Sequence, residues 1–216
     1  MNALNISKTG PTITRRKALA VMAMPAAIAA AGQALSQAPK PAFTLLLVND
    51  IYKMNAEKGR GGFARLAAIA KAERARGVPL LFAHAGDCFS PSLMSGFDQG
   101  AHVVELQNMI GLDVFVPGNH EFDFGKENYL KRVSEQTYPT FAANLRDAGG
   151  KRLPRHEDSR IFELGGIKVG VLGLALENTP QVSSTGDLTF TSVMDALRVE
   201  VKLLKENGAE FIVAVT

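Results

Sequence analysis

The segment Val116–Asp123 reads Val-Pro-Gly-Asn-His-Glu-Phe-Asp and gathers an amide, an imidazole and two carboxylates within five residues. It continues a short apolar run that breaks at Pro-Gly, as expected where a buried strand reaches the edge of a sheet. Metal ligation and acid–base chemistry both need groups of these types on a rigid support. The alternative is a polar turn that caps the following helix through Asn119 or Asp123.

Two earlier apolar runs end in residues of the same kind. Phe43–Val48 leads to Asp50, and Pro79–Ala83 leads to Asp87. The intervals from these aspartates to Asn119 suit repeated strand–helix–strand units of about 30 residues or more. Parallel strands place their C-terminal ends at one edge of a sheet, so the three oxygen donors should converge there. The sequence therefore predicts a metal site at this edge.

Helical and β-rich patterns alternate between these residues. Apolar residues recur at helical spacing, or helix signals occur, over about residues 62–76, 99–110, 126–134 and 192–207. Strands are predicted at 43–48, 80–83, 114–116, 140–143 and 211–215. Two further β-rich runs, 161–164 and 167–174, flank Gly165-Gly166 and predict a hairpin. This alternation is typical of an α/β fold.

The charge of the chain is unevenly distributed. The formal net charge is +3, but residues 1–38 hold four basic side chains and no acidic one. The remaining residues therefore carry 20 basic and 21 acidic side chains. No basic surface is indicated, which argues against a nucleic-acid partner. The single cysteine, Cys88, excludes an intramolecular disulfide and is predicted to be a small buried residue rather than a metal ligand.

The N-terminal residues resemble an export signal. Thr14–Leu19 has a twin-arginine start, and Ala18–Ala31 is a modestly apolar segment. Small residues offer cleavage after Ala31, Ala34 or Ala38. The alternatives are an ordinary secretory signal or a membrane helix, for which the apolar segment is too short to span a bilayer. We expect residues 1–38 to be a twin-arginine export signal and linker, with no stable membrane span and a periplasmic mature protein.

From Phe43 to Thr216 the chain resembles the metallophosphoesterases of the 5′-nucleotidase and 2′,3′-cyclic phosphodiesterase family. Gly86-Asp87 and the segment Gly118–Asp123 carry the resemblance. Supporting features are Asn49-Asp50, Gly61-Gly62 and Ala143-Asn144. The resemblance implies a four-layer α/β/β/α catalytic domain, of which residues 39–216 would be the N-terminal part. The stop at Thr216, flush with a predicted strand, leads us to expect a domain that is incomplete at its C-terminus.

The resemblance also implies roles for individual residues. Asp50 would ligate the first of two divalent metal ions, Asp87 would bridge both, and Asn119 would ligate the second. His120, paired with Asp123, would stabilise the transition state or protonate the leaving oxygen. The implied function is hydrolysis of nucleotides or related phosphate esters by a metal-activated water.

Two departures from the family pattern bear on this reading. Tyr52 stands where the family has a histidine ligand, so it either ligates the metal or packs aside. The histidine ligands that the family carries on later strands have no match, and we expect His84 at the core or sheet edge, with His102 and His156 on the surface. One alternative is a truncated or degenerate, non-catalytic protein that retains partial metal or phosphate binding. Another is an enzyme for cyclic nucleotides or sulfur esters.

Overall fold

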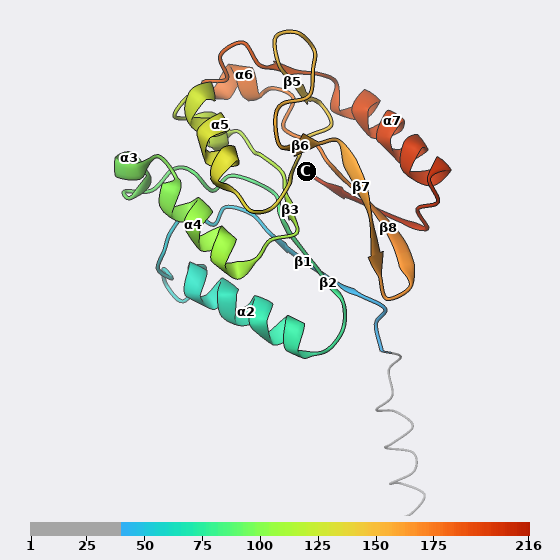
Figure 1. The fold of residues 1–216 in the computed structure, drawn as a ribbon. Helices are drawn as coiled ribbons and strands as arrows, with labels where there is room; N and C mark the ends of the chain where they lie inside the picture. The colour runs from blue at the N-terminus through green and yellow to red at the C-terminus, as the bar shows by residue number, and fades with distance from the viewer. Residues whose placement is uncertain (1–39) are drawn as a thin grey trace, which may run out of the picture. The chain divides into compact units, whose positions relative to one another are not determined.

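The computed structural model describes residues 40–216, which are drawn in colour in Figure 1. The predicted twin-arginine signal and its cleavage sites lie outside the described residues. Within the described part of the chain, no helix has both the length and the apolar character needed to cross a membrane.

Five short strands form a parallel sheet. They are β1 (Thr44–Val48), β2 (Leu80–His84), β3 (Val114–Phe115), β4 (Thr140–Phe141) and β6 (His156–Glu157). Their order across the sheet is β1-β2-β3-β4-β6, and every neighbouring pair is parallel. Val48 pairs with His84, and His84 pairs with Phe115, so the first three strands end side by side. The C-terminal ends of all five strands therefore lie at one edge.

Helices cover one face of this sheet, as Figure 1 shows. They are α2 (Phe63–Ala75), α4 (Ala101–Ile110) and α5 (Lys126–Glu135). Leu66, Val103 and Tyr129, one from each helix, pack in a single buried cluster with Phe82 and Phe115 of the sheet. Burial of these large side chains is the main favourable term that holds the helices to the sheet.

A second sheet contains β7 (Ser159–Leu164), β8 (Ile167–Gly173) and β10 (Phe211–Val215), in the order β10-β8-β7. The antiparallel β7–β8 pair turns at Gly165 and Gly166, whose φ angles of 59° and 82° suit a tight hairpin. Helix α7 (Val193–Glu206) connects β8 to the parallel strand β10. It begins after Ser192, whose hydroxyl accepts a hydrogen bond from the Asp195 amide at 3.3 Å.

Two more clusters join the remaining layers. Leu81 and Ala83 of β2 pack against Val169 and Val171 of β8, between the two sheets. On the other face of the second sheet, Leu204 of α7 joins a third cluster. The predicted α/β fold with a parallel sheet is confirmed. The clusters lie in the order that a helix–sheet–sheet–helix arrangement requires (Figure 1).

Short elements fill the connections. They are α3 (Ser95–Asp98), the 3-10 turn η1 (His120–Phe122), α6 (Thr179–Val182) and the antiparallel pair β5 (Leu145–Arg146) and β9 (Thr189–Phe190). Gln99 and Gly100 have positive φ angles of 53° and 87°, so α4 starts at Ala101 rather than at 99. The strand predicted at 140–143 ends at Phe141.

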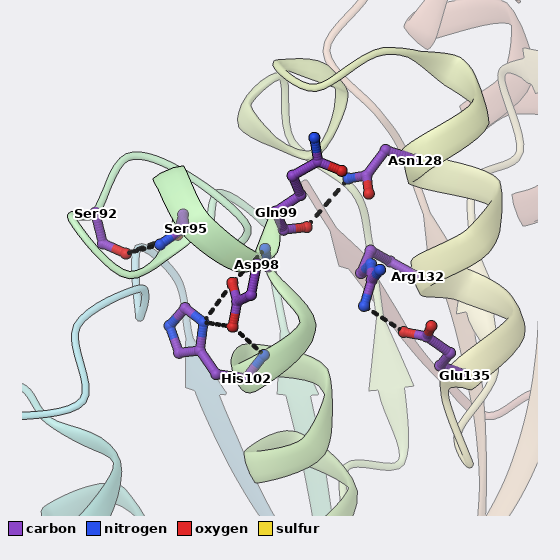
Figure 2. Close-up of polar contacts among 9 residues, drawn as sticks. Ser92, Ser95, Asp98, Gln99, His102, Asn128, Arg132 and Glu135 are labelled. Atoms are coloured by element: carbon purple, nitrogen blue, oxygen red, sulfur yellow. Dashed lines mark hydrogen bonds and ion pairs between the residues drawn. The ribbon is translucent and has the colours of Figure 1, made fainter.

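The surface prediction for His102 and His156 is wrong, because both are buried. Figure 2 shows the His102 ring beside Asp98, whose carboxylate lies 2.8 Å from Nδ1 and also accepts the His102 backbone N–H. His156 donates from Nδ1 to the Pro154 carbonyl at 2.8 Å, and its Nε2 lies 2.5 Å from the Tyr129 hydroxyl. Each ring has a polar partner, which makes burial tolerable.

Candidate active site

The loops after β1, β2 and β3 carry the predicted oxygen donors at one edge of the sheet. Asp50 follows β1, Asp87 follows β2 and Asn119 follows β3. The Asp50 amide donates to the Gly86 carbonyl at 3.1 Å, which holds the first two loops together beyond the last strand pair. The parallel register thus brings the ends of segments far apart in sequence to the same edge.

Both aspartates have an unusual backbone. Asp50 and Asp87 each have a φ of 57°, in the left-handed region. Aspartate enters this region more readily than most residues, yet the conformation still costs on the order of 1 kcal/mol. Strained backbone of this kind clusters at functional sites, where the surrounding structure holds a side chain in one required position. Lys58, Gln99 and Arg155 share this backbone conformation, and Asp50 and Asp87 are the only acidic residues among the described ones that do.

Two glycines let the second and third loops approach each other. A Cβ on Gly86 would lie 2.2 Å from the Gly118 nitrogen, and a Cβ on Gly118 would lie 2.2 Å from Oδ1 of Asp87. Both distances are far below van der Waals contact. Glycine is therefore required at both positions for the Asp87 carboxylate to sit beside the loop that carries Asn119 and His120.

Glu121 holds together the loop after β2 and the loop after β3. Its side chain is fully buried and accepts four backbone N–H bonds, from Asp87, Cys88, Phe89 and Gly118, at 2.6–3.2 Å. Burial raises its pKa, and the hydrogen bonds from the amides oppose that shift. The sequence analysis assigned Glu121 no role. The available signal was a carboxylate inside a glycine-rich segment, where loop amides lack strand partners.

His120 and Asp123 form a close pair. Nδ1 of His120 lies 2.6 Å from Oδ2 of Asp123. Burial alone would lower the pKa of His120, but the hydrogen bond and charge of Asp123, with the charges of Asp87 and Glu121, raise it above its usual value. Burial likewise favours neutral Asp123, yet hydrogen bonds from His120, Ser90 and Ser183 leave its pKa lowered.

A hydrogen bond connects the His120–Asp123 pair to the loop that follows β2. The His120 backbone N–H donates to Oδ1 of Asp87 at 3.0 Å. Asn119 immediately precedes η1 but makes no side-chain capping bond there, and α5 begins after Gly125 without a side-chain cap. The helix-capping alternative for Asn119 and Asp123 is therefore wrong. The side chain of Asp123 is instead engaged with His120 and two serines.

The loops at this edge carry donor types that suit a hard divalent cation. Asp50, Asp87 and Asn119 offer carboxylate and amide oxygens, the donor types that Mg²⁺ and Mn²⁺ prefer. Within residues 40–216, no group of three or more His, Cys, Asp or Glu side chains lies close enough to hold a metal ion. The three residues fit a cation by donor type, and the described residues by themselves do not complete a ligand shell.

Tyr52 lies two residues after Asp50. It is half-buried and lines, together with Asp50, a cavity of about 240 Å³. A neutral phenol is a weak metal ligand compared with the imidazole that the family has there.

The other residues considered from the sequence have structural roles. His84 is fully buried, as predicted, and its Nδ1 accepts the Gly86 amide at 3.0 Å; burial lowers its pKa to about 3, so it stays neutral. Cys88 is buried, as predicted, and burial raises the pKa of its thiol. Asn144 is buried and bonds the main chain of Ala175, so its side chain is used in packing the loops.

Several known proteins are similar to this chain in sequence and fold. The 5′-nucleotidase of Mus musculus is 30% identical over 192 residues, covering 79% of this chain and 33% of the mouse protein. The NAD nucleotidase of Haemophilus influenzae superposes with a TM-score of 0.73 at 25% identity, covering 80% of this chain and 37% of that chain. A 5′-nucleotidase precursor from Thermus thermophilus gives 0.70 at 26% identity, covering 80% and 36%.

This chain spans about a third of the length of the curated relatives that it matches. The profile of the calcineurin-like phosphoesterases matches residues 43–216, which include both glycine-containing loops, the left-handed aspartates and the His120–Asp123 pair. The chain belongs to the calcineurin-like phosphoesterase family.

Proposed function

We propose that this chain supplies the metal-binding and proton-donating part of an exported phosphoesterase that hydrolyses nucleotides or related phosphate esters. The observation that carries the proposal is the continuous connection from Asp87 through His120 to Asp123. The His120 amide holds Asp87 at 3.0 Å, and the imidazole of the same residue holds Asp123 at 2.6 Å. The candidate proton donor is thus itself bonded to a candidate metal ligand on one side and to its carboxylate partner on the other.

Asp50, Asp87 and Asn119 would hold two divalent ions, with Asp87 between them. When bound, the ions would activate water and stabilise charge on the phosphoryl oxygens. Asp87 is suited to the shared position because Gly118 leaves room beside its carboxylate. Glu121 would keep the loops of Asp87 and Gly118 at a fixed separation through its amide contacts. Tyr52, lining the cavity beside Asp50, would pack against the substrate rather than ligate.

His120 would act on the leaving group. In hydrolysis, the water oxygen forms a bond to phosphorus, the bond between phosphorus and the ester oxygen breaks, and the leaving oxygen takes up a proton. An imidazolium at His120 can donate that proton from Nε2, because Nδ1 is engaged by Asp123. Asp123 would fix the ring and favour its charged form, as a carboxylate partner does for other catalytic histidines.

The relatives support the substrate class in this proposal. Proteins named 5′-nucleotidase and NAD nucleotidase align over most of this chain, which supports a nucleotide substrate. Export to a periplasm by the twin-arginine machinery is proposed on the signal-like residues 1–38 alone.

The test is an assay of AMP hydrolysis with Mn²⁺ or Zn²⁺ added. The sample is the protein produced from its complete gene. The variant His120→Gln should lower kcat about a hundredfold or more if the imidazole donates the proton. His102→Gln is the matched control, because His102 lies on α4 and is bound to Asp98 of α3 rather than to a predicted site residue. Equal activity of both variants would rule out this role for His120.

A non-catalytic protein is the second candidate. It is favoured by one observation: the described residues provide no group of three His, Cys, Asp or Glu side chains placed for a metal. Under this alternative, divalent ions bind weakly and no phosphate ester is hydrolysed at any metal concentration. Calorimetric titration of Mn²⁺ alongside the AMP assay separates the two functions.

A further inference from the structure

The Asp123 carboxylate accepts hydrogen bonds from three different segments. Oδ2 accepts from the Ser90 hydroxyl at 2.6 Å and lies 2.6 Å from Nδ1 of His120. Oδ1 accepts from the Ser183 hydroxyl at 2.7 Å. These lengths are typical of hydrogen bonds to an ionised carboxylate. Neither serine was a candidate from the sequence.

The two serines constrain a torsion that is otherwise soft. The terminal torsion of an aspartate side chain is broad, so a carboxylate held at one oxygen can turn and change the direction of its bond to histidine. Here Ser90 binds one oxygen and Ser183 binds the other. Because both oxygens are held, the plane of the Asp123 carboxylate is fixed. The direction of its hydrogen bond with the His120 imidazole is therefore fixed as well.

Ser183 lies on a firmly attached segment. It ends α6, and its backbone N–H donates to the Thr179 carbonyl at 2.9 Å. Farther along, Leu188 is buried in the same cluster as the helices, and Asp187 forms an ion pair with Lys126 at the start of α5. These attachments restrict the movement of the segment that carries Ser183. The contact between Ser183 and Asp123 is therefore not one at a freely moving loop tip.

Ser90 comes from a different loop, the one that follows β2. It is buried and follows Cys88 and Phe89, whose amides are held by Glu121. The loop that carries the Ser90 hydroxyl is therefore held by the same Glu121 carboxylate that holds the Asp87 amide.

We propose that Ser90 and Ser183 are positioning residues, which fix the Asp123 carboxylate and through it the imidazole of His120. The inference rests on the proposed phosphoesterase function only for its effect on rate. Ser183 belongs to the connection between β8 and β10 of the second sheet, whereas His120 follows β3 of the first. The orientation of the proton donor thus depends on a residue that is distant in sequence.

The first readout needs neither metal nor substrate. In nitrogen-15 NMR of the chain, the proton on Nδ1 of His120 should be observed and should exchange slowly with water; His120→Gln identifies its signal. Ser183→Ala should accelerate that exchange about tenfold or more. The matched control is Ser184→Ala, since Ser184 is an exposed neighbouring serine that makes no bond to Asp123. Ser183→Thr keeps the hydroxyl and should restore slow exchange.

The second readout is the dependence of rate on the leaving group. Ser183→Ala should lower kcat for AMP about tenfold, with KM changed less than about twofold, because substrate binding is not affected. The loss should be smaller for p-nitrophenyl phosphate, whose leaving group departs without a proton. A general loss of folded protein would reduce both rates equally.

The outcomes separate the two proposals. If the unaltered protein hydrolyses neither substrate, the proposed function fails, while the exchange measurement still decides the positioning role. If Ser183→Ala matches Ser184→Ala in proton exchange and in the ratio of the two rates, the positioning role is wrong. Ser90→Ala should reproduce the effect of Ser183→Ala, since it removes the donor to the other carboxylate oxygen.

Discussion

The carboxylate of Glu121 accepts the backbone amide of Asp87 at 2.8 Å, so a buried acid fixes a candidate metal ligand through the main chain. The same carboxylate also binds the Gly118 amide at 2.6 Å, in the loop of the next strand. The separation of the two loops is therefore set by one fully buried side chain.

Glu121→Gln should destabilise the fold. A glutamine has one acceptor oxygen, so in either orientation its NH₂ group faces two of the four amides. We expect the free energy of unfolding to fall by about 3 kcal/mol, measured by urea denaturation. Glu105→Gln is the control, because Glu105 is exposed on α4. Equal stability of the two variants would mean that the amide contacts contribute nothing.

Gly118→Ala should displace the Asp87 carboxylate. The added Cβ would lie 2.2 Å from Oδ1 of Asp87, so the aspartate or the loop must move. We expect divalent-ion affinity to fall about tenfold and stability to fall by about 2 kcal/mol. Gly96→Ala is the matched control, because a Cβ there meets nothing within 4 Å. An unchanged Mn²⁺ titration for Gly118→Ala would contradict the role of this contact.

Acid should destabilise the protein through His156. Burial lowers its pKa to about 4, whereas the unfolded chain has its usual pKa near 6.5. The unfolded state thus takes up the proton first as pH falls. The free energy of unfolding should therefore decrease from about pH 6.5 towards pH 4, by about 3 kcal/mol, and be fully restored above pH 6.5.

Urea denaturation across this pH range checks the His156 prediction. His156→Gln should be less stable at pH 7, because its bond to the Tyr129 hydroxyl is lost, but it should depend less on pH. His84 is also buried, and its pKa is lowered to about 3. The stability of both proteins should therefore still fall somewhat as the pH falls. Parallel pH profiles for the two proteins would show that His156 does not titrate as described.

Substitutions at Tyr52 distinguish a ligand from a lining residue. Tyr52→Phe removes only the hydroxyl and should change Mn²⁺ or Zn²⁺ affinity less than about twofold, because a neutral phenol binds these ions poorly. Tyr52→His adds an imidazole beside Asp50 and should raise Zn²⁺ affinity about tenfold. Calorimetry gives both values. A tenfold loss in Tyr52→Phe would instead identify the phenol as a ligand.

The local pattern of the sequence determined most of the elements. Strand β10 and helix α7 match the predicted ranges within a residue or two, because apolar periodicity and the cap at Ser192 are local signals. Placing Asp50, Asp87 and Asn119 at one edge needed only the rule that parallel strands end on the same side. The candidate proton donor was also named from its own motif.

Only the tertiary structure decided how those residues are held. The burial of His102 and His156 depends on partners that no periodicity indicates, Asp98 and the Tyr129 hydroxyl. The contact of Ser183 with Asp123 joins residues 60 apart, and Glu121 binds amides more than 30 residues away. A sequence pattern reports which face of an element is apolar, whereas the packing of loops fixes which polar atoms meet.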